Sequence, residues 1–113
     1  KIPGGSDCPI EEGNPLFEFY AAVTRQDHSS WPENGWQPQE KLTHHNAFKM
    51  FNHWAAYGGF DENRRGKIDL GYDADLTILS NNILKSEPAD ILQIKIIKTI
   101  INGKIFSNGC LDM

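Results

Sequence analysis

The sequence Ile2-Pro3-Gly4-Gly5-Ser6-Asp7-Cys8-Pro9 places a carboxylate on a stiff corner that follows a short extended run. The glycines allow the backbone to turn tightly, while Pro9 fixes its own φ and biases Cys8 toward an extended conformation. An acid in this position suits the end of a strand that faces a pocket, and in parallel α/β barrels catalytic side chains lie at the carboxyl ends of strands. Asp7 is therefore a candidate catalytic residue. The alternative, which these residues alone favour, is an ordinary turn in which the Asp7 side chain caps nearby amides.

An amphipathic helix is predicted directly after this corner. Asn14 is a good N-cap and Pro15 suits the first helical position, so the helix begins there and runs to about Arg25. Apolar residues then recur at i, i+3, i+4 and i+7, which places them on one face. These residues are Leu16, Phe19, Tyr20 and Val23. A strand end, a loop and a helix follow one another here as in a βα unit.

A second helix is predicted after a long loop. Leu42-Thr43 opens this helix with the threonine as its N-cap, and Gly58-Gly59 ends it as a left-handed cap. Its buried stripe consists of Ala47, Phe51, Trp54 and Ala55. In the loop at residues 26–39, Trp31 and Trp36 are expected to cover a nearby apolar surface, and the lining of a pocket stays open as the alternative.

The second half of the chain has a β pattern. Strands are predicted at residues 76–79 and 94–101, with a polar loop at residues 81–90 between them. Asn102-Gly103 lies between apolar β-branched residues, which is the strongest short-range signal for a hairpin, here at residues 99–106. The isoleucine-rich faces of these few strands need a partner sheet or helix to cover them.

The composition is that of a globular domain. The chain has 113 residues, of which 39% are hydrophobic and 23% charged, and this suffices for one domain with a modest core. Its net charge of −4 argues against nucleic acid as a partner. No apolar run approaches the ~20 residues of a membrane span, so no membrane partner is expected either.

The ends of the chain and its cysteines bear on whether it is part of a longer protein and on its cellular compartment. Lys1-Ile2-Pro3 contains neither an initiator methionine nor a signal peptide, which predicts an internal start in a longer protein. The tail at residues 107–113 is expected to fray. Cys8 and Cys110 could pair, but a single pair is weak evidence for an oxidising compartment, so two free thiols are expected. The compartment is left unassigned, with the cytoplasm slightly favoured.

The histidines of the chain do not form a metal-binding motif. They are His28, His44, His45 and His53. The sequence contains no Cys-x-x-Cys, His-x-His or His-Glu-x-x-His, whereas a zinc site needs about three protein ligands for catalysis and four for structure. We therefore expect no metal site made by this chain alone. A nucleophilic triad of Ser6, a histidine and Asp7 stays open, although nothing in the sequence places a histidine near Ser6.

Short motifs occur along nearly the whole chain. They are Gly5-Ser6-Asp7-Cys8-Pro9, Asn14-Pro15-Leu16, Tyr20-Ala21-Ala22-Val23-Thr24-Arg25, Lys41-Leu42-Thr43, Gly66-Lys67-Ile68-Asp69-Leu70-Gly71-Tyr72-Asp73-Ala74-Asp75-Leu76 and Thr99-Ile100-Ile101-Asn102-Gly103-Lys104. In this order the chain resembles the amidohydrolase superfamily, and most closely its metal-dependent hydrolase branch called amidohydrolase family 3. The Gly-Ser-Asp corner and the Gly-x-x-x-x-Gly-x-x-Ala-Asp-Leu segment are specific together and weak singly.

The resemblance implies an α/β fold, which for the chain by itself reduces to α+β. Residues 1–60 are expected to be the last strand–helix unit of a (β/α)8 barrel together with the helix that follows it. Residues 61–113 are expected to be the C-terminal strands of the β-sandwich that accompanies the barrel in this family, with the hairpin at residues 99–106.

The resemblance also implies metal-dependent hydrolysis. In the family, the aspartate that ends the last barrel strand touches a divalent ion, commonly zinc, and Asp7 matches that aspartate. The carboxylate accepts a proton from the metal-bound water and passes it to the leaving amine. Asp7 is thus expected to be both a catalytic and a metal-binding residue. The intact enzyme would hydrolyse an amide or other non-peptide C–N bond of a small-molecule substrate.

The chain departs from the family because it lacks most of the metal ligands. The His-x-His of the first barrel strand, the metal-bridging residue of the fourth and the histidines of the fifth and sixth are absent, and a barrel needs about 200 residues or more. We therefore expect a C-terminal fragment that is inactive and metal-free alone and has the rest of the barrel as its partner. A regulatory or binding module without catalysis, as in relatives described as exoenzyme regulators, is the alternative, and self-association stays open.

Overall fold

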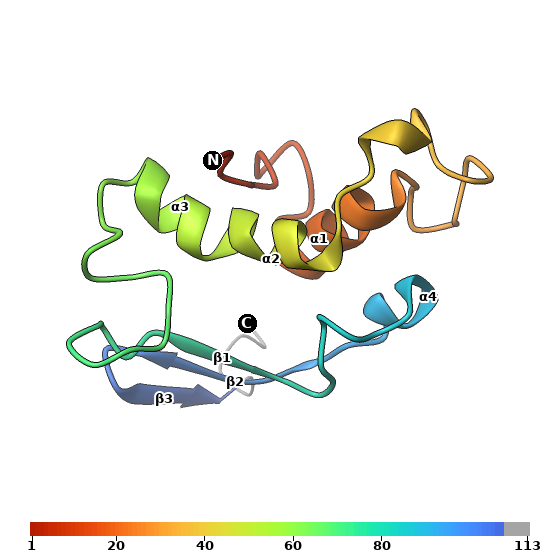
Figure 1. Cartoon of the computed structure of the whole chain (residues 1–113). Coiled ribbons are helices and arrows are strands. Elements are labelled where there is room, and N and C mark those ends of the chain that lie inside the picture. Colours follow the sequence, from red (N-terminus) through yellow and green to blue (C-terminus); the bar gives the residue numbers. More distant parts are fainter. Residues whose placement is uncertain (108–113) are drawn as a thin grey trace.

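The computed structural model describes residues 1–107 and places a helical layer above a three-stranded antiparallel sheet (Figure 1). The helices are α1 (Pro15–Thr24), a short 3-10 helix (Pro38–Glu40), α2 (His44–Phe51), α3 (His53–Gly58) and α4 (Pro88–Ile91). The strands are β1 (Leu76–Leu79), β2 (Ile96–Ile101) and β3 (Lys104–Ser107). The expected α+β character of the chain is confirmed. In this part of the chain, every helix is too short or too polar to cross a bilayer.

Helix α1 begins and ends as its sequence predicts. The Asn14 side chain accepts a hydrogen bond from the Leu16 N–H at 3.0 Å, and Pro15 occupies the first helical position. Arg25 follows the helix in the left-handed conformation with a φ of 59°, and its N–H donates to the Ala21 carbonyl. The predicted apolar stripe is confirmed, since Leu16, Phe19, Tyr20 and Val23 are all buried.

The predicted second helix is divided in two at Asn52. Its start is as expected, because the Thr43 hydroxyl accepts a hydrogen bond from the Asn46 N–H at 3.2 Å. At Asn52 the backbone leaves helical geometry, with a φ of −128° and a ψ of −95°. The Asn52 side chain donates to the Phe48 carbonyl at 2.8 Å and so competes with the helical hydrogen bonds. Two helices, α2 and α3, therefore replace the single one predicted.

The left-handed cap predicted at Gly58-Gly59 is wrong. Gly59 has a φ of −88°, and the positive φ falls on Phe60, at 60°. The Gly59 N–H is bonded to the Ala55 carbonyl at 3.0 Å, so the helical turn continues through Gly59 and the chain reverses only afterwards. Of the predicted stripe, Ala47 is buried, whereas Phe51, Trp54 and Ala55 are half-buried.

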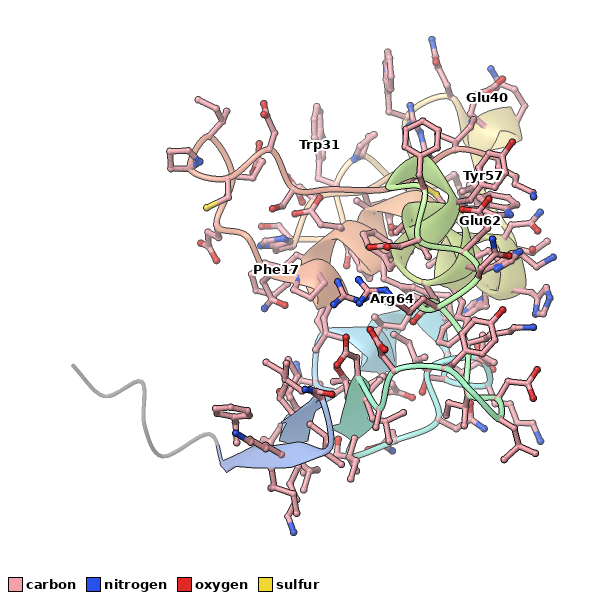
Figure 2. The ribbon with its side chains drawn as sticks, turned by 90° about the vertical axis from the view of Figure 1, so that its left-hand side faces the viewer. Phe17, Trp31, Glu40, Tyr57, Glu62 and Arg64 are labelled. Atoms are coloured by element: carbon pink, nitrogen blue, oxygen red, sulfur yellow. The ribbon has the colours of Figure 1, made fainter. Side chains whose placement is uncertain are left out.

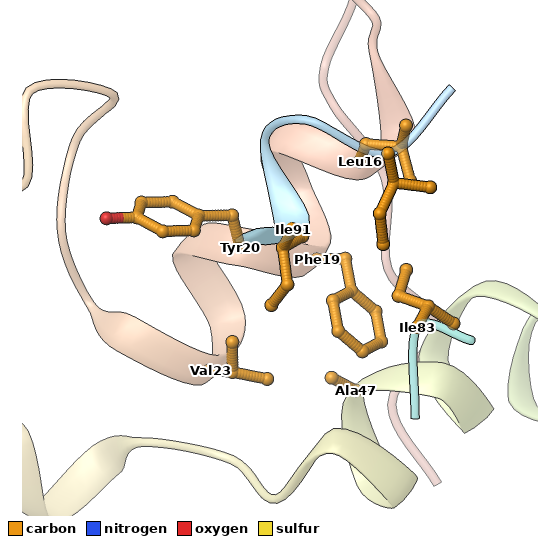
Figure 3. Packing of buried hydrophobic residues seen from close by; sticks show 8 residues of the cluster. Leu16, Phe19, Tyr20, Val23, Ala47, Ile83 and Ile91 are labelled. Carbon is orange, nitrogen blue, oxygen red and sulfur yellow. The ribbon is translucent and has the colours of Figure 1, made fainter. Parts of the chain in front are cut away.

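The hydrophobic core joins the two halves of the chain (Figure 3). Residues of α1 and α2 pack there with Ile83, Ile91 and Ile94 from the second half. Ile91 is fully buried and belongs to α4, which contacts α1. The loop predicted at residues 81–90 is therefore wrong at its end, because Pro88 opens a helical turn that carries Ile91 into the core.

The sheet has the strand order β1-β2-β3, with antiparallel neighbours throughout. Thr77 pairs with Thr99, and Ile100 pairs with Ile105. The turn at Asn102-Gly103 has positive φ angles of 49° and 75°, which confirms the predicted hairpin. The preceding strand begins at Ile96, two residues later than predicted.

The loop at residues 26–39 leaves both tryptophans on the surface. Trp31 is 70% exposed and Trp36 is 60% exposed, so the expectation that they cover an apolar surface is wrong. Hydrogen bonds stabilise the loop instead, since the Gln26 side chain donates to two carbonyls within it, at 2.8 and 3.0 Å. The Arg25 guanidinium lies 5.0 Å from the centroid of the Trp36 ring.

Two predictions, the frayed tail and the two free thiols, involve residues near the C-terminus. Ser107 belongs to β3, and the rest of the tail predicted to fray lies outside the described residues. Cys8 is exposed and forms no disulfide within residues 1–107. Cys110 also lies outside them, so the free state of both thiols stays a prediction.

Replacing Phe19 by alanine is expected to lower the free energy of unfolding by about 3–5 kcal/mol, because the change leaves a cavity in the core. Phe19 is 2% exposed, whereas Leu70 is 98% exposed and provides the control. Leu70→Ala should change the free energy by no more than about 0.5 kcal/mol. Urea denaturation of the 113-residue chain, followed by circular dichroism, measures both values, and equal losses would contradict the assigned core.

Candidate functional site

The corner that carries Asp7 is docked on the helical layer. Residues 1–6 form no strand, so the strand end predicted before Asp7 is wrong for this chain. A parallel strand obtains its hydrogen bonds from neighbouring strands, and none lies beside this segment within residues 1–107. The Gly4 N–H donates instead to the Met50 carbonyl of α2, at 3.0 Å.

Asp7 opens a tight backbone turn and exposes its carboxylate. Its carbonyl accepts a hydrogen bond from the Ile10 N–H at 2.8 Å, and its φ is 55°. The Asp7 side chain is exposed and makes no hydrogen bond or ion pair within the described residues. The backbone therefore closes this turn, which argues against the capping alternative and leaves both carboxylate oxygens free to meet a ligand.

The described residues do not assemble a metal site by themselves. Between Lys1 and Ser107 there is no group of three or more His, Cys, Asp or Glu side chains that could hold an ion. His44 Nε2 is bonded to the Ser86 carbonyl at 3.0 Å, and the His28 ring packs on Phe17 with centroids 3.9 Å apart. Ser6 has no histidine as a hydrogen-bond partner in this part of the chain, which argues against a nucleophilic triad.

Charged side chains gather where the chain passes from α3 to β1. This linker network consists of Asp61, Arg64, Arg65, Asp73 and Asp75. Arg65 Nε lies 2.9 Å from Asp73 Oδ2 and 3.6 Å from Asp75 Oδ2. Figure 2 shows Arg64 between the helical layer and the sheet, where its Nη1 lies 3.3 Å from Asp73 Oδ2. Exposed ion pairs each contribute only about 0–1 kcal/mol, so the network mainly orients the linker.

The linker connects the sheet to the helical layer. Asp75 Oδ1 accepts a hydrogen bond from the N–H of Asn102, the first turn residue of the hairpin, at 2.8 Å. Toward its other end the linker lies against α3 at Gly66, which has a φ of +91°. A Cβ at Gly66 would lie 2.8 Å from Ala56 Cβ, so both the dihedral and the space require glycine.

Hydrogen bonds in the linker shift three pKa values toward the charged forms. A side-chain bond to an aspartate of the network raises the pKa of the Arg65 guanidinium. Contacts with Tyr72 and then Asp69 raise the pKa of the Lys67 ammonium, which lies 4.6 Å from the centroid of the Tyr72 ring. The bond from the Leu70 N–H, 2.9 Å long, and then the Lys67 charge lower the pKa of the Asp69 carboxyl.

Sequence reasoning missed the linker network. The charged residues at positions 61–66 predict a solvated connection between the two halves of the chain. A local signal existed, because Asp61 precedes two arginines by three and four residues, a spacing at which side chains can meet. The pairing with Asp73 and Asp75 depends on how the linker reverses, which no local spacing reveals.

One family model matches nearly the whole chain. The chain belongs to the amidohydrolase family, whose family model matches residues 1–106. Members of this family are hydrolases that generally depend on a metal ion. The resemblance noted from the motifs is thereby confirmed at the level of the family.

Two curated proteins are similar to this chain. "Putative amidohydrolase YtcJ" of Bacillus subtilis (strain 168) is 41% identical over 104 residues, which make up 90% of this chain and 19% of that protein. "Protein LONG AFTER FAR-RED 3" of Arabidopsis thaliana is 30% identical over 100 residues, or 88% of this chain and 17% of that protein. The chain thus spans about a fifth of the length of these relatives. No solved structure gives a significant match.

Asp69 is expected to titrate below the ordinary aspartate value of 3.8, because the Leu70 N–H and Lys67 favour its charged form. A carboxyl whose pKa is lowered on folding adds stability above its unfolded pKa, and that stability is lost as the pH falls through the folded value. Carboxyl-carbon NMR at acid pH measures the midpoint.

Two lysine variants test the cause of this shift. Lys67→Ala should raise the Asp69 midpoint only part of the way toward 3.8, because the bond from the backbone remains. Lys85→Ala removes a lysine that makes no ion pair within the described residues, and it should leave the midpoint unchanged. A wild-type midpoint at or above 3.8 would contradict the local electrostatics described here.

Proposed function

We propose that this chain is the C-terminal part of a metal-dependent amidohydrolase that hydrolyses an amide or other non-peptide C–N bond of a small molecule. The family match carries the proposal, because it runs through residues 1–106 although the chain covers only 19% of the Bacillus relative. The chain is too short for a complete barrel, which takes about 200 residues or more. Alone it is therefore expected to be inactive.

In the intact protein we assign residues 1–60 to the last βα unit of a (β/α)8 barrel and its following helix. We assign residues 61–113 to the C-terminal strands of the accompanying β-sandwich. The sheet supports this assignment, because several of its apolar side chains are between 43% and 63% exposed and would need a second layer to cover them. They are Ile78, Ile97, Ile101, Ile105 and Phe106.

Asp7 is the residue that we assign to the reaction. Its carboxylate is exposed, free of hydrogen bonds within residues 1–107 and held at a tight turn. A divalent ion, zinc in this proposal, would be held mainly by the rest of the protein and would lower the pKa of water toward ~7. Asp7 would be one of its ligands, and its carboxylate would take a proton from the attacking water and return it to the leaving amine.

A regulatory or binding module without catalysis is the second candidate function. One observation favours it: the name of the Arabidopsis relative states no reaction. The two candidates differ in what they require of Asp7. A hydrolase needs its proton-accepting carboxylate, whereas a binding module needs at most its shape and polarity.

Asp7→Asn in the longer protein that contains this chain is expected to lower kcat by about 10²–10⁴-fold, because the amide keeps the size of the side chain but cannot accept a proton. Asp90→Asn makes the same change at an exposed aspartate of α4 and should leave kcat unchanged. The substrate is the best-hydrolysed compound in a panel of N-acyl amino acids, anilides and cyclic ureides. Thermal melting checks the fold of each variant.

Two outcomes of this experiment would overturn the assignment. Near-normal turnover by Asp7→Asn would remove Asp7 from the mechanism and leave the hydrolysis to other residues. A longer protein that hydrolyses no member of the panel would contradict the proposed bond class.

The 113-residue chain is expected to retain no stoichiometric zinc after dialysis, because Asp7 cannot supply the three or four ligands of a zinc site. The longer protein should retain about one or two ions per chain. Elemental analysis of both proteins, purified without tags, makes the comparison. About one zinc per short chain would show that this chain holds a complete site of its own, contrary to the proposal.

A further inference from the structure

The residues that precede the Asp7 corner are held against α2 and α3 by three contacts. These contacts join Lys1 to Tyr57, Pro3 to Gly58 and Gly4 to Met50. In the first, the ammonium lies 3.9 Å from the centroid of the tyrosine ring, and in the third the backbone hydrogen bond is 3.0 Å long. Three successive points of attachment therefore set how residues 1–4 lie on the helices.

The contact between Pro3 and Gly58 leaves no room for a side chain. A Cβ at Gly58 would lie 2.5 Å from Pro3 Cγ, well inside the 3.0 Å below which one of the two groups must shift. A long side chain could swing away, but the proline ring is bonded to its own backbone nitrogen. A methyl group at position 58 therefore requires the Pro3 ring, or the segment that carries it, to move away from α3.

Space alone excludes alanine at position 58. The backbone of Gly58 is outside the left-handed region, and the residue ends α3, so an alanine would adopt its conformation without strain. Helix propensity favours alanine over glycine by about 1 kcal/mol in a helix interior. The local backbone therefore does not account for the glycine, whereas its contact with Pro3 does.

We propose that Gly58 is a positioning residue for the Asp7 carboxylate, because the missing side chain sets how closely residues 1–4 approach α3. This role rests on the proposed function, in which Asp7 acts on the substrate. Only Gly5 and Ser6 separate the attached Gly4 from Asp7, so a shift of residues 1–4 has a short path along the chain to the carboxylate. A reacting group displaced by about 1 Å can cost about 10²-fold in rate.

Gly59 supplies a matched control at the next residue. A Cβ on Gly59 would lie 3.6 Å from the carbonyl oxygens of Ala55 and Ala56, which is ordinary van der Waals contact. Its φ of −88° suits alanine as well. Gly59→Ala therefore adds the same methyl group to the end of α3 without touching Pro3.

The first test measures the docking itself on the 113-residue chain, with neither substrate nor metal. Amide hydrogen exchange of Gly4 should be slow in the wild type and in Gly59→Ala, because its N–H is bonded to the Met50 carbonyl. In Gly58→Ala the Gly4 amide is expected to exchange about 10-fold faster or more, since the segment is pushed off the helix. An unprotected Gly4 in the wild type, or equal exchange in the two variants, would overturn the proposal.

The second test measures turnover in the longer protein, with the amide panel described above. Gly58→Ala should lower kcat by about 10–100-fold relative to Gly59→Ala, with similar KM and melting temperature. The double variant Pro3→Ala/Gly58→Ala should regain most of that kcat, because removing Cγ leaves Pro3 Cβ as the nearest atom, at 3.5 Å. Equal kcat in the two single variants, or a double variant as slow as Gly58→Ala, would refute the positioning role.

Asp7→Asn separates this inference from the proposed function. If Asp7→Asn retains turnover, the proposed role of Asp7 fails, whatever Gly58→Ala does. If Asp7→Asn loses turnover while Gly58→Ala matches Gly59→Ala, the proposed function stands and only the role of Gly58 fails.

Discussion

Burial of one face of α1 is the constraint on which the rest of the structure depends. Phe19 and Tyr20, each 2% exposed, belong to one cluster with Ala47 of α2 and Ile91 of α4 (Figure 3). A helix of 10 residues is marginal in water, so tertiary packing and not propensity stabilises it. The same packing holds the second half of the chain against the first, because Ile91 packs into this cluster.

The linker network provides a second connection between the halves. At one end of the sheet Asp75 bonds to the hairpin turn, and Gly66 lies closely against α3. The sheet is thus attached through the linker and through α4, while Ile105 remains 63% exposed and other apolar side chains are partly exposed. Polar contacts orient this half of the chain, while part of its apolar surface remains exposed.

The Asp7 corner combines a local turn with distant attachments. The bond from the Ile10 N–H to the Asp7 carbonyl closes the turn, so the neighbouring sequence decides its shape. The hydrogen bond from the Gly4 N–H to the Met50 carbonyl and the contact of Pro3 with Gly58 determine the position of that turn relative to α2 and α3. The placement of the carboxylate therefore depends on residues some fifty positions away in the sequence.

The sequence by itself determined the features whose partners are close along the chain. Asn14 and Thr43 cap helices, and Asn102-Gly103 forms a hairpin turn, because these features depend on dihedral angles and hydrogen bonds a few residues apart. The motifs likewise identified the family and singled out Asp7. Only the tertiary structure decided the α4 turn, the exposure of both tryptophans, the linker network and the docking of the corner. Each of these depends on packing or charge pairing between segments that are distant in the sequence. A local periodicity does not predict how such segments pack against one another.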